Sequence, residues 1–343
     1  MGGYHSGLTA FINMITVIVL VTGGILITKA QVSVTDLVTF LLYISIMTDP
    51  VRTMIDFAEM FQNGYSGYER FQEILAIEPD IQDSQGSEEL TDVKGTIDFE
   101  NVSFQYEENT EKVLSHIDLH VDAGEYLALV GSSGAGKTTL CNLIPRFYDA
   151  TAGAVKINGK NVKDFDLETL RKMVGIVPQK AVLFKGTIED NLCWGKKDAT
   201  EEELWGALET AQAAEFVRER ADGLQAKIDQ GGKNLSGGQR QRLTIARALV
   251  GHPGILILDD SASALDFATD AALRKALREM KGNPIVFIVS QRTSSIRHAD
   301  QIIVLDDGMV AGIGNHQELL ENCPVYQEIY YSQFDRKEER AHA

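Results

Sequence analysis

Two adjacent carboxylates stand at the end of an aliphatic run in ILILDDSASALD, residues 255–266. An ionised aspartate at the end of a buried strand costs free energy unless a cation or hydrogen-bond donors meet it. Asp259 is therefore a candidate ligand of a divalent cation. Asp260 stands where a base could orient or deprotonate an attacking water molecule. A helix cap or turn would explain one acidic residue here, but it explains two poorly.

A glycine-rich loop in another part of the chain would bind the phosphate groups that accompany such a cation. The sequence GSSGAGKTT, residues 131–139, follows the apolar segment YLALV and precedes a helical pattern. Strand, glycine-rich loop and helix in this order are typical of a P-loop, in which backbone N–H groups point at phosphate oxygens. We expect the apolar face of the helix to comprise Leu140, Leu143, Ile144 and Phe147.

The residue types of this loop predict how it would contact the phosphates of a nucleoside triphosphate. Lys137 would neutralise the β and γ phosphates, and the hydroxyl of Thr138 would bind Mg²⁺ together with Asp259. The other loop residues that we expect to contact the nucleotide are Gly131, Ser132, Gly134, Ala135, Gly136 and Thr139.

A second candidate surface lies in LSGGQRQRLTIARALV, residues 235–250. Ser236 is a good N-cap, and Gly237 and Gly238 leave backbone N–H groups exposed where a helix begins. Together with Gln239 they predict another phosphate-binding surface. Taken alone, the segment is also compatible with an ordinary capped amphipathic helix; the P-loop and the aspartate pair favour the functional interpretation.

The elements that position these residues follow from the hydrophobic pattern. Alternation in residues 96–104 and 116–122 predicts an antiparallel sheet. Further along, apolar strands alternate with helical stretches, which predicts a mostly parallel sheet with helices on its faces. The strands of that sheet are expected at YLALV, MVGIV, ILIL, PIVFIV and QIIVL.

The N-terminal part has a different composition. Leu8–Thr28 is an uncharged run of 21 residues, long enough as a helix to cross a bilayer core, and Leu37–Thr48 is a shorter uncharged run that would return. A buried helix of a soluble protein is the alternative for the first run. We expect two membrane helices at about 8–28 and 37–58 in a region 1–75, a polar linker 76–95, a globular domain 96–335 and a charged tail 336–343.

Composition limits the classes of partner and compartment. The net charge of −17 argues against a protein that binds nucleic acid, because phosphate backbones attract basic surfaces. The cysteines, Cys141, Cys193 and Cys323, are far apart and show no disulfide or metal-ligand spacing, which fits a reducing cytosol.

With these motifs in place, the chain resembles the ABC transporter superfamily, in particular the half-transporters of bacterial multidrug and lipid exporters. LSGGQ is similar to the family signature, SALD at 263–266 to its D-loop, and residues 176–191 to its Q-loop segment. The resemblance implies that Gln179 lies near Mg²⁺ and the membrane coupling helices, and that Tyr106 stacks on adenine. An ordinary strand-end tyrosine is the alternative for Tyr106.

The fold class implied is an α-helical transmembrane hairpin followed by an α/β P-loop NTPase domain with antiparallel β and helical subdomains. The implied ligands are ATP and Mg²⁺. The implied partner is a second ABC half-transporter, paired head to tail so that each ATP lies between the P-loop of one chain and the signature of the other. Membrane lipids and a transported substrate, which would be a drug, a lipid or a peptide whose identity the sequence does not give, complete the expected partners.

The chain departs from the family pattern at two catalytic positions. Asp260 replaces the catalytic glutamate, and Gln291 replaces the switch histidine. A base misplaced by about 1 Å loses on the order of a hundredfold in rate, and glutamine carries no positive charge. Because LSGGQ is intact, the combination resembles the degenerate member of a heterodimer, whose partner bears the Glu and His. We expect ATP binding with slow hydrolysis at the chain's own site.

Only two of the family's six membrane helices are visible, and two cannot enclose a translocation path with a matching pair from one partner. We therefore expect an N-terminally truncated product or a fragmentary reading frame, with a naturally short subunit as the alternative. The protein is expected in the plasma membrane with its ATPase domain in the cytosol. The alternatives are a competent homodimeric exporter and a truncated nucleotide-binding regulatory protein without transport. A soluble DNA-acting ATPase is opposed by the hairpin and the acidity.

Overall fold

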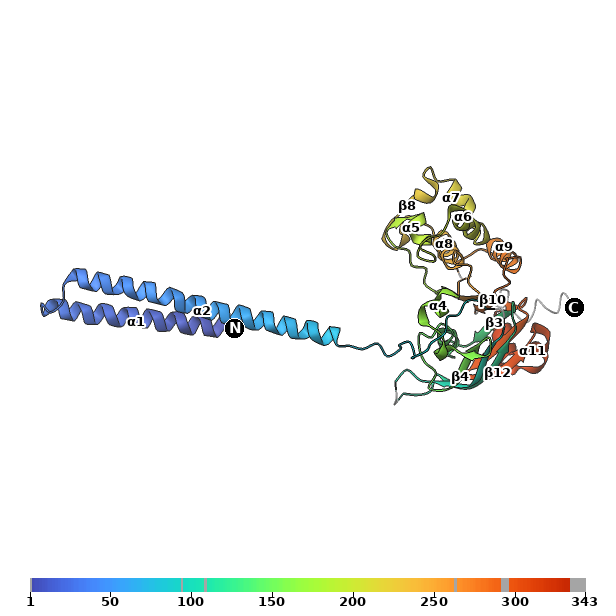
Figure 1. Cartoon of the computed structure of the whole chain (residues 1–343), viewed down its shortest axis with the longest axis horizontal. Coiled ribbons are helices and arrows are strands. Elements are labelled where there is room, and N and C mark those ends of the chain that lie inside the picture. The colour runs from blue at the N-terminus through green and yellow to red at the C-terminus, as the bar shows by residue number, and fades with distance from the viewer. Residues whose placement is uncertain (1, 94, 108–109, 262–263, 291–295, 334–343) are drawn as a thin grey trace. The chain divides into compact units, whose positions relative to one another are not determined.

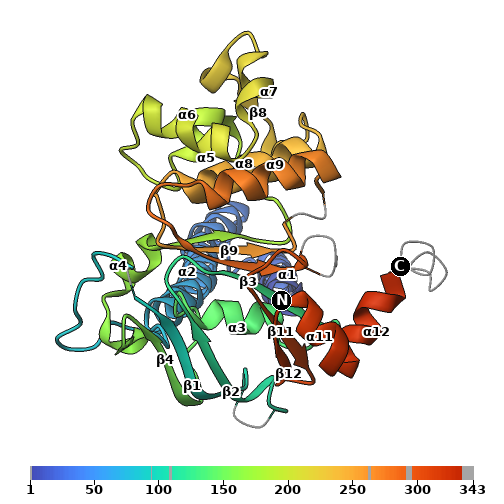
Figure 2. The same cartoon turned by 90° about the vertical axis from the view of Figure 1, so that its right-hand side faces the viewer.

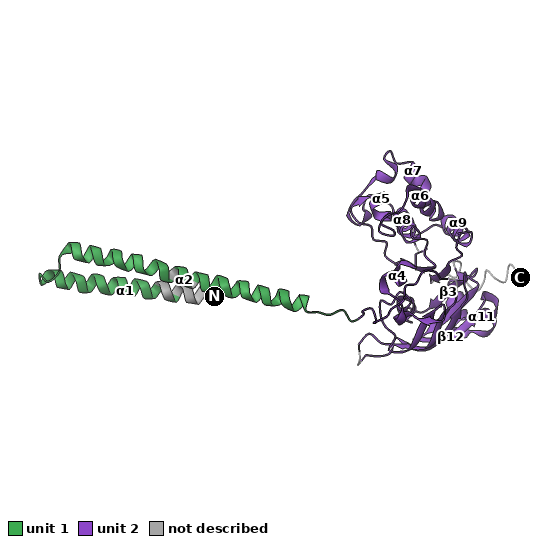
Figure 3. Cartoon of the chain, viewed as in Figure 1, with its two compact units in different colours: residues 1–80 green, residues 81–343 purple. Residues whose placement is uncertain are grey.

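The structure is a computed structural model that describes residues 2–93, 95–107, 110–261, 264–290 and 296–333. The chain forms two compact units, residues 1–80 and 81–343. Figure 1 colours the chain by residue number, and Figure 3 gives each unit its own colour. Each unit is described by itself.

The first unit is a helical hairpin of α1, Gly2–Thr28, and α2, Val34–Leu75. Ser33 caps α2 and shares a capping box with Asp36, which fixes where the second helix begins. At Gly23 a Cβ atom would lie 2.4 Å from Cδ1 of Leu37, so the missing side chain lets the two helices approach closely. Both helices contain segments long and apolar enough to cross a membrane.

The second helix is longer than expected. The sequence pattern placed its end near residue 58, but α2 continues to Leu75 and contains Pro50. The expectation followed the loss of apolar character after Thr48, and hydrophobicity does not determine where a helix ends. Met, Glu, Gln and Arg, which are frequent from Met54 onward, are good helix formers.

Part of the expected linker belongs to the second unit. Leu90 and Val93 are buried, and the N–H of Leu90 donates to Oγ1 of Thr169 at 3.1 Å. Oδ1 of Asp83 accepts a hydrogen bond from the N–H of Leu167 at 2.8 Å. The polar composition of this segment therefore hid two apolar residues that fill the domain core.

An antiparallel sheet begins the second unit, with strand order β2-β1-β4-β5. Its inward residues pack against α3 and one face of the central sheet in one continuous core. The expected alternating strands are thus confirmed, and Ile117, Leu119 and Val121 point inward. The strands are β1 Ile97–Phe104, β2 Leu114–Val121, β4 Ala152–Ile157 and β5 Lys160–Asn161.

The central sheet has the order β12-β11-β3-β10-β9-β6, and all neighbours in it are parallel except β11 and β12. Each of the five apolar segments proposed from the sequence forms one of its strands, so the predicted mostly parallel sheet is confirmed. The strands are β3 Tyr126–Gly131, β6 Val174–Val177, β9 Ile255–Asp259, β10 Ile285–Val289, β11 Gln301–Asp306 and β12 Met309–Gly314.

Helices cover both faces of this sheet, as Figure 2 shows. A helical subdomain packs on one of the two faces. The helices are α3 Lys137–Leu143, α4 Leu167–Lys172, α5 Ile188–Leu192, α6 Glu201–Thr210, α7 Ala214–Arg218, α8 Gly237–Leu249, α9 Phe267–Arg278, α11 His316–Asn322 and α12 Pro324–Gln333. The short elements are β7 Gly186–Thr187, β8 Lys227–Ile228 and 3₁₀ turns at Val162–Asp164, Gly223–Gln225 and Gln230–Gly232.

One expected core residue is misplaced. Phe147 was assigned to the apolar face of the helix after the P-loop, but α3 ends at Leu143 and the Phe147 side chain is 44% exposed. The chain leaves the helical path at Arg146, whose φ of 53° is left-handed, so the helical spacing no longer applies. Phe147 instead lies under the guanidinium of Arg171, 5.5 Å from its ring centroid.

Phe287 is fully buried in β10, between β3 and β9. A substitution of Phe287 therefore tests how much the core of the central sheet contributes to stability. We expect Phe287→Ala to lower the free energy of unfolding by about 3–5 kcal/mol, through lost burial and the cavity left behind. Both tryptophans, Trp194 and Trp205, lie in this unit, so denaturant unfolding of the full chain in detergent can be followed by their fluorescence.

The matched control is Phe267→Ala, since Phe267 is 75% exposed. It should change the free energy by no more than about 0.5 kcal/mol. Equal effects of the two variants would contradict the assignment of Phe287 to the core.

Candidate functional site

A small cavity of about 140 Å³ lies where β3, β9 and β10 end. Parallel strands present their carboxyl ends at one edge of a sheet, which is where ligands of open α/β sheets bind. The cavity brings together residues of the P-loop, the aspartate pair and the Q-loop segment. Its lining residues are Ser133, Gly134, Lys137, Thr138, Gln179, Asp259, Asp260, Val289 and Ser290.

The P-loop follows β3 and depends on glycine geometry. Gly134 and Gly136 have φ values of 85° and 95°, a region that residues with a Cβ atom rarely adopt. At Gly136 a Cβ atom would also lie 2.6 Å from Cδ2 of Leu114 and 3.0 Å from the carbonyl oxygen of Val113. The N-cap of α3, Gly136, supplies no side-chain hydrogen bond, which leaves the first N–H groups of the helix available to a ligand.

Lys137 places its ammonium group inside the loop. Its side chain is buried, and Nζ donates to the carbonyl oxygens of Gly131 at 2.9 Å and Ser132 at 2.6 Å. Burial lowers the pKa of Lys137, and the nearby carboxylates of Asp259 and Asp260 oppose that shift. An anion in the loop would compensate the buried positive charge, so the residues present fit a phosphate group.

Asp259 ends β9 and accepts a hydrogen bond from Oγ1 of Thr138, with 2.9 Å between the two oxygens. Burial raises the pKa of Asp259; the Thr138 hydrogen bond lowers it, Asp260 raises it, and Lys137 lowers it. A carboxylate and a hydroxyl this close are the oxygen donors that Mg²⁺ prefers alongside phosphates. The predicted pairing of these two residues is therefore present, and their chemistry fits the ion.

Asp260 follows in a left-handed conformation, with a φ of 46°, and its N–H donates to the carbonyl oxygen of Val289 at 2.8 Å. Aspartate tolerates this conformation better than most residues. Nε2 of Gln179 lies 3.4 Å from Oδ2 of Asp260, at the long limit of a hydrogen bond. The structure thus brings Gln179 to the aspartate pair, from a segment that the sequence assigned by resemblance alone.

Tyr106 lies at the edge of the P-loop helix rather than in the cavity. Its hydroxyl and Oγ1 of Thr139 are 2.9 Å apart, and its ring is 51% exposed. The ring of Tyr148 meets it edge-on, with 5.2 Å between centroids. An exposed ring held beside the P-loop is available for stacking, and Tyr148 is a neighbour that sequence reasoning missed because residues 106 and 148 belong to different segments.

The signature residues occupy a separate place. Ser236 caps α8, its Oγ accepting from the N–H of Gln239 at 3.2 Å, while Oε1 of Gln239 accepts from the N–H of Ser236 at 3.1 Å. Both side chains thus hold the helix start, and Gly237 is exposed. None of the described residues that line the P-loop cavity belongs to 236–239, so a single chain does not join the two surfaces.

Two expected residues lie outside the described part of the chain, Gln291 and Ser263 of the D-loop. The cavity adds residues that were not proposed, Ser133, Val289 and Ser290. Their signal was present in the sequence, since Ser290 directly follows an apolar strand, as the aspartate pair does.

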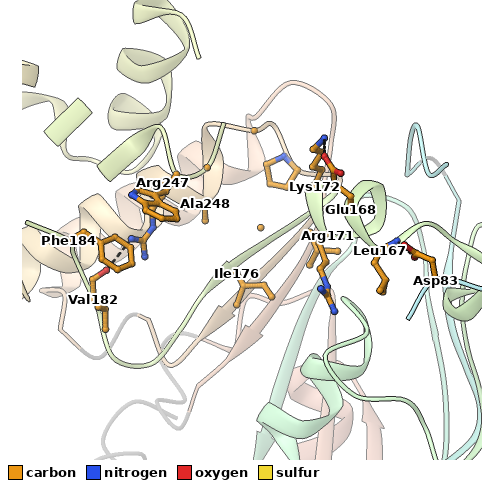
Figure 4. Close-up of a pocket in the computed structure, with 16 residues that line it drawn as sticks. Asp83, Leu167, Glu168, Arg171, Lys172, Ile176, Val182, Phe184, Arg247 and Ala248 are labelled. Carbon is orange, nitrogen blue, oxygen red and sulfur yellow. Dashed lines mark hydrogen bonds and ion pairs between the residues drawn. The ribbon is translucent and has the colours of Figure 1, made fainter. Parts of the chain in front are cut away.

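A larger groove of about 770 Å³ separates the α/β core from the helical subdomain (Figure 4). Arg171 and Ile176 lie on its core side, and Phe184 and Arg247 on the other. The Arg247 guanidinium lies 5.9 Å from the ring centroid of Phe184 and donates to the carbonyl oxygen of Val182 at 3.1 Å. Exposed rings beside fixed cations make this groove suited to a protein segment.

Comparison with known proteins agrees with this geometry. Residues 114–263 match the family model described as "ABC transporter". The chain is 39% identical over 322 residues to the uncharacterized ABC transporter ATP-binding protein YwjA of Bacillus subtilis, covering 94% of this chain and 56% of that protein. It is 42% identical over 285 residues to the ATP-dependent lipid A-core flippase of Desulfotalea psychrophila, covering 83% and 50%.

A solved structure described as a bacterial Atm1-family ABC exporter with ATP bound has a TM-score of 0.77 to this chain at 31% identity. The match covers 88% of this chain and 53% of that one. It supports the predicted fold class of N-terminal helices followed by an ATPase domain with antiparallel, mixed-sheet and helical parts. The chain spans about half the length of the curated relatives it matches.

The raised pKa of Asp259 leads to a prediction about pH. A protonated Asp259 cannot bind Mg²⁺, so the Mg²⁺-dependent part of nucleotide affinity should fall with decreasing pH, beginning above the ordinary aspartate pKa of 3.8. Fluorescent ATP titrations with and without Mg²⁺, repeated at decreasing pH from neutrality, measure this effect.

Asp259→Asn should remove both the Mg²⁺ dependence and its change with pH. Asp198→Asn, at an exposed loop position, should leave both unchanged. A Mg²⁺-dependent affinity that is equally strong in the Asp259→Asn variant would exclude Asp259 as a ligand.

Proposed function

We propose that the chain is a member of the ABC transporter family, whose model it matches over residues 114–263, and that its second unit binds ATP with Mg²⁺ and couples nucleotide binding to export across a membrane. The single observation that carries the proposal is the convergence of Lys137, Thr138 and Asp259 at one edge of the central sheet. A buried ammonium, a hydroxyl and a carboxylate from segments distant in sequence are the groups that a magnesium–triphosphate complex needs.

ATP binding is assigned to the P-loop, residues 131–139, with the base against Tyr106. Lys137 would exchange its two carbonyl contacts for phosphate oxygens, a gain for a buried cation that now has only neutral acceptors. Thr138, Asp259 and Gln179 would hold Mg²⁺, whose contribution is to neutralise phosphate charge. Within the described residues no group of three His, Cys, Asp or Glu side chains could hold a metal, so phosphate oxygens would complete its shell.

The site is proposed to be completed by a second chain. The signature residues 236–239 do not reach the P-loop cavity of their own chain, and Ser236 with the N–H groups of α8 forms a ready phosphate surface. Head-to-tail pairing would bring this surface of one chain to the ATP of the other. An intact signature allows the chain to serve a partner's site whatever the competence of its own.

Hydrolysis at the chain's own site is proposed to be slow. Asp260 is one methylene shorter than glutamate, and its left-handed backbone fixes where the carboxylate can reach. Gln291 cannot supply the charge of a histidine. The partner best suited to this chain is therefore a half-transporter that bears the Glu and the His, in a heterodimer with one competent site.

Transport is proposed through membrane helices that include α1 and α2. The groove of Figure 4 adjoins the Q-loop segment through Val182 and Phe184, so it suits a cytoplasmic loop of an exporter's membrane domain. One relative is named a lipid A-core flippase and another a putative multidrug exporter, YgaD of Bacillus subtilis. We propose a lipid or drug-like substrate and a location in the plasma membrane, with the ATPase unit in the cytosol.

The proposed slow hydrolysis has a direct test in Asp260→Glu. The longer side chain should raise the steady-state ATPase rate of the purified full chain by on the order of a hundredfold, because it moves the base by about 1 Å toward the attacking water. Combining it with Gln291→His should raise the rate further. The matched control is Asp260→Asn, which removes the base at nearly unchanged size and should abolish the residual rate.

A wild-type rate equal to that of Asp260→Glu would instead support the competent homodimeric exporter. Unchanged ATP binding in all three variants would show that the changes act on hydrolysis. Retained ATP binding without substrate movement in reconstituted vesicles would favour a regulatory nucleotide-binding protein.

A further inference from the structure

A second pocket, of about 210 Å³, lies between α9 and the beginning of β3. Four basic side chains line it: Arg274, Lys275, Arg278 and His298. No aspartate or glutamate is among its described lining residues, although the chain as a whole has a net charge of −17. Guanidinium and ammonium groups that line one pocket offer several charged N–H donors to an anion.

Tyr126 supplies a buried donor to the same pocket. Its side chain is 4% exposed, and its hydroxyl has no hydrogen-bond partner among the described residues. Burial raises the pKa of Tyr126, so the phenol keeps its proton. A buried hydroxyl without a partner costs free energy, and an acceptor in the pocket would relieve that cost.

Arg278 retains donors after its internal pairs with described residues are counted. Arg274 pairs with Asp270 at 2.7 Å, and Arg278 uses one nitrogen, Nη2, for Asp300 at 3.1 Å and the carbonyl oxygen of His298 at 2.7 Å. Within the described part of the chain, Nε and Nη1 of Arg278 make no hydrogen bond, while its guanidinium carbon lies 4.6 Å from the ring centroid of Tyr126. The Tyr126 ring therefore holds Arg278 at the pocket.

Lys275 and His298 complete the lining. Nζ of Lys275 lies 3.9 Å from Glu279, and the Lys275 side chain is 78% exposed. Nε2 of His298 accepts from Nε of Arg297 at 3.1 Å, which leaves its Nδ1 as the protonated nitrogen. Burial lowers the pKa of His298, followed by the charges of Arg297, Arg274 and Arg278.

We propose that this pocket binds a small soluble phosphate or phosphomonoester. A phosphate group offers three acceptor oxygens, enough to engage the Tyr126 hydroxyl, the remaining N–H groups of Arg278 and the Lys275 ammonium together. Arginine clusters recognise phosphate in preference to neutral ligands because several N–H groups meet it in a planar fork.

This pocket is distinct from the P-loop cavity. Tyr126 begins β3 and Gly131 ends it, which separates the two sites by about 16 Å of strand. The two cavities share no lining residue. An anion here would contact α9 and residue 298, which come from separate segments of the chain.

The test uses the full chain in neutral detergent with its histidine rings labelled with ¹³C, observed by NMR at constant ionic strength. His298 reports on this pocket alone, and its signal is identified by its loss in His298→Asn. Inorganic phosphate should shift the His298 signal saturably, whereas sodium chloride should not. Tyr126→Phe and Arg278→Gln should each raise the phosphate Kd about tenfold, the effect of losing one hydrogen bond to a charged ligand.

Lys172→Gln, at an exposed position on α4, is the matched control and should leave the Kd unchanged. Tyr126→Phe removes one oxygen and keeps the ring, so its effect does not depend on refolding of the site. No saturable shift, or a Kd unchanged in both pocket variants, would overturn the proposal. A shift given by phosphatidic acid and not by inorganic phosphate would also overturn it, since the ligand would then be a lipid headgroup.

Discussion

The site depends on one hydrogen bond across the sheet edge, from Oγ1 of Thr138 to Oδ2 of Asp259. It joins side chains 121 residues apart in sequence, and it exists because β3, β10 and β9 are parallel neighbours whose carboxyl ends coincide. The P-loop leaves one of these strands and the aspartate pair ends another. The fold thus brings together the oxygens that we propose to bind the cation before any ligand arrives, which would reduce the ordering cost of binding.

The charged side chains at this edge bear on two properties of the site, its fit to a magnesium–phosphate complex and its capacity for hydrolysis. Lys137, Asp259 and Asp260 are only partly exposed to solvent, and burial shifts the pKa of Lys137 down and that of Asp259 up. A magnesium–phosphate complex would stabilise the charged form of each. Catalysis asks more, because a base must reach the attacking water, and the left-handed backbone of Asp260 sets the limit of its short side chain. We therefore propose that this chain binds ATP but hydrolyses it slowly.

Much of the fold and the P-loop could be predicted from the sequence, because strand patterns and glycine-rich loops are local signals. Apolar runs predicted the central strands correctly. The predicted end of α2 and the predicted core position of Phe147 were wrong, because the end of a helix depends on its backbone conformation and not on its hydrophobic pattern. Ser290 follows an apolar strand, but the sequence does not show that this strand, β10, is the neighbour of β9, which brings Ser290 to the cavity. The pocket at Tyr126 has no sequence signal, since it forms between residues of four separate segments.

The most direct measurement is a calorimetric titration of ATP and Mg²⁺ into the full chain and into its Lys137→Ala variant, with Lys172→Ala as the control. Removing the buried ammonium should weaken nucleotide binding roughly 10- to 100-fold, the loss of a hydrogen bond to a charged group, while the control binds as the wild type does. Equal affinity of the wild type and the Lys137→Ala variant would contradict the assignment of this loop as the phosphate-binding site.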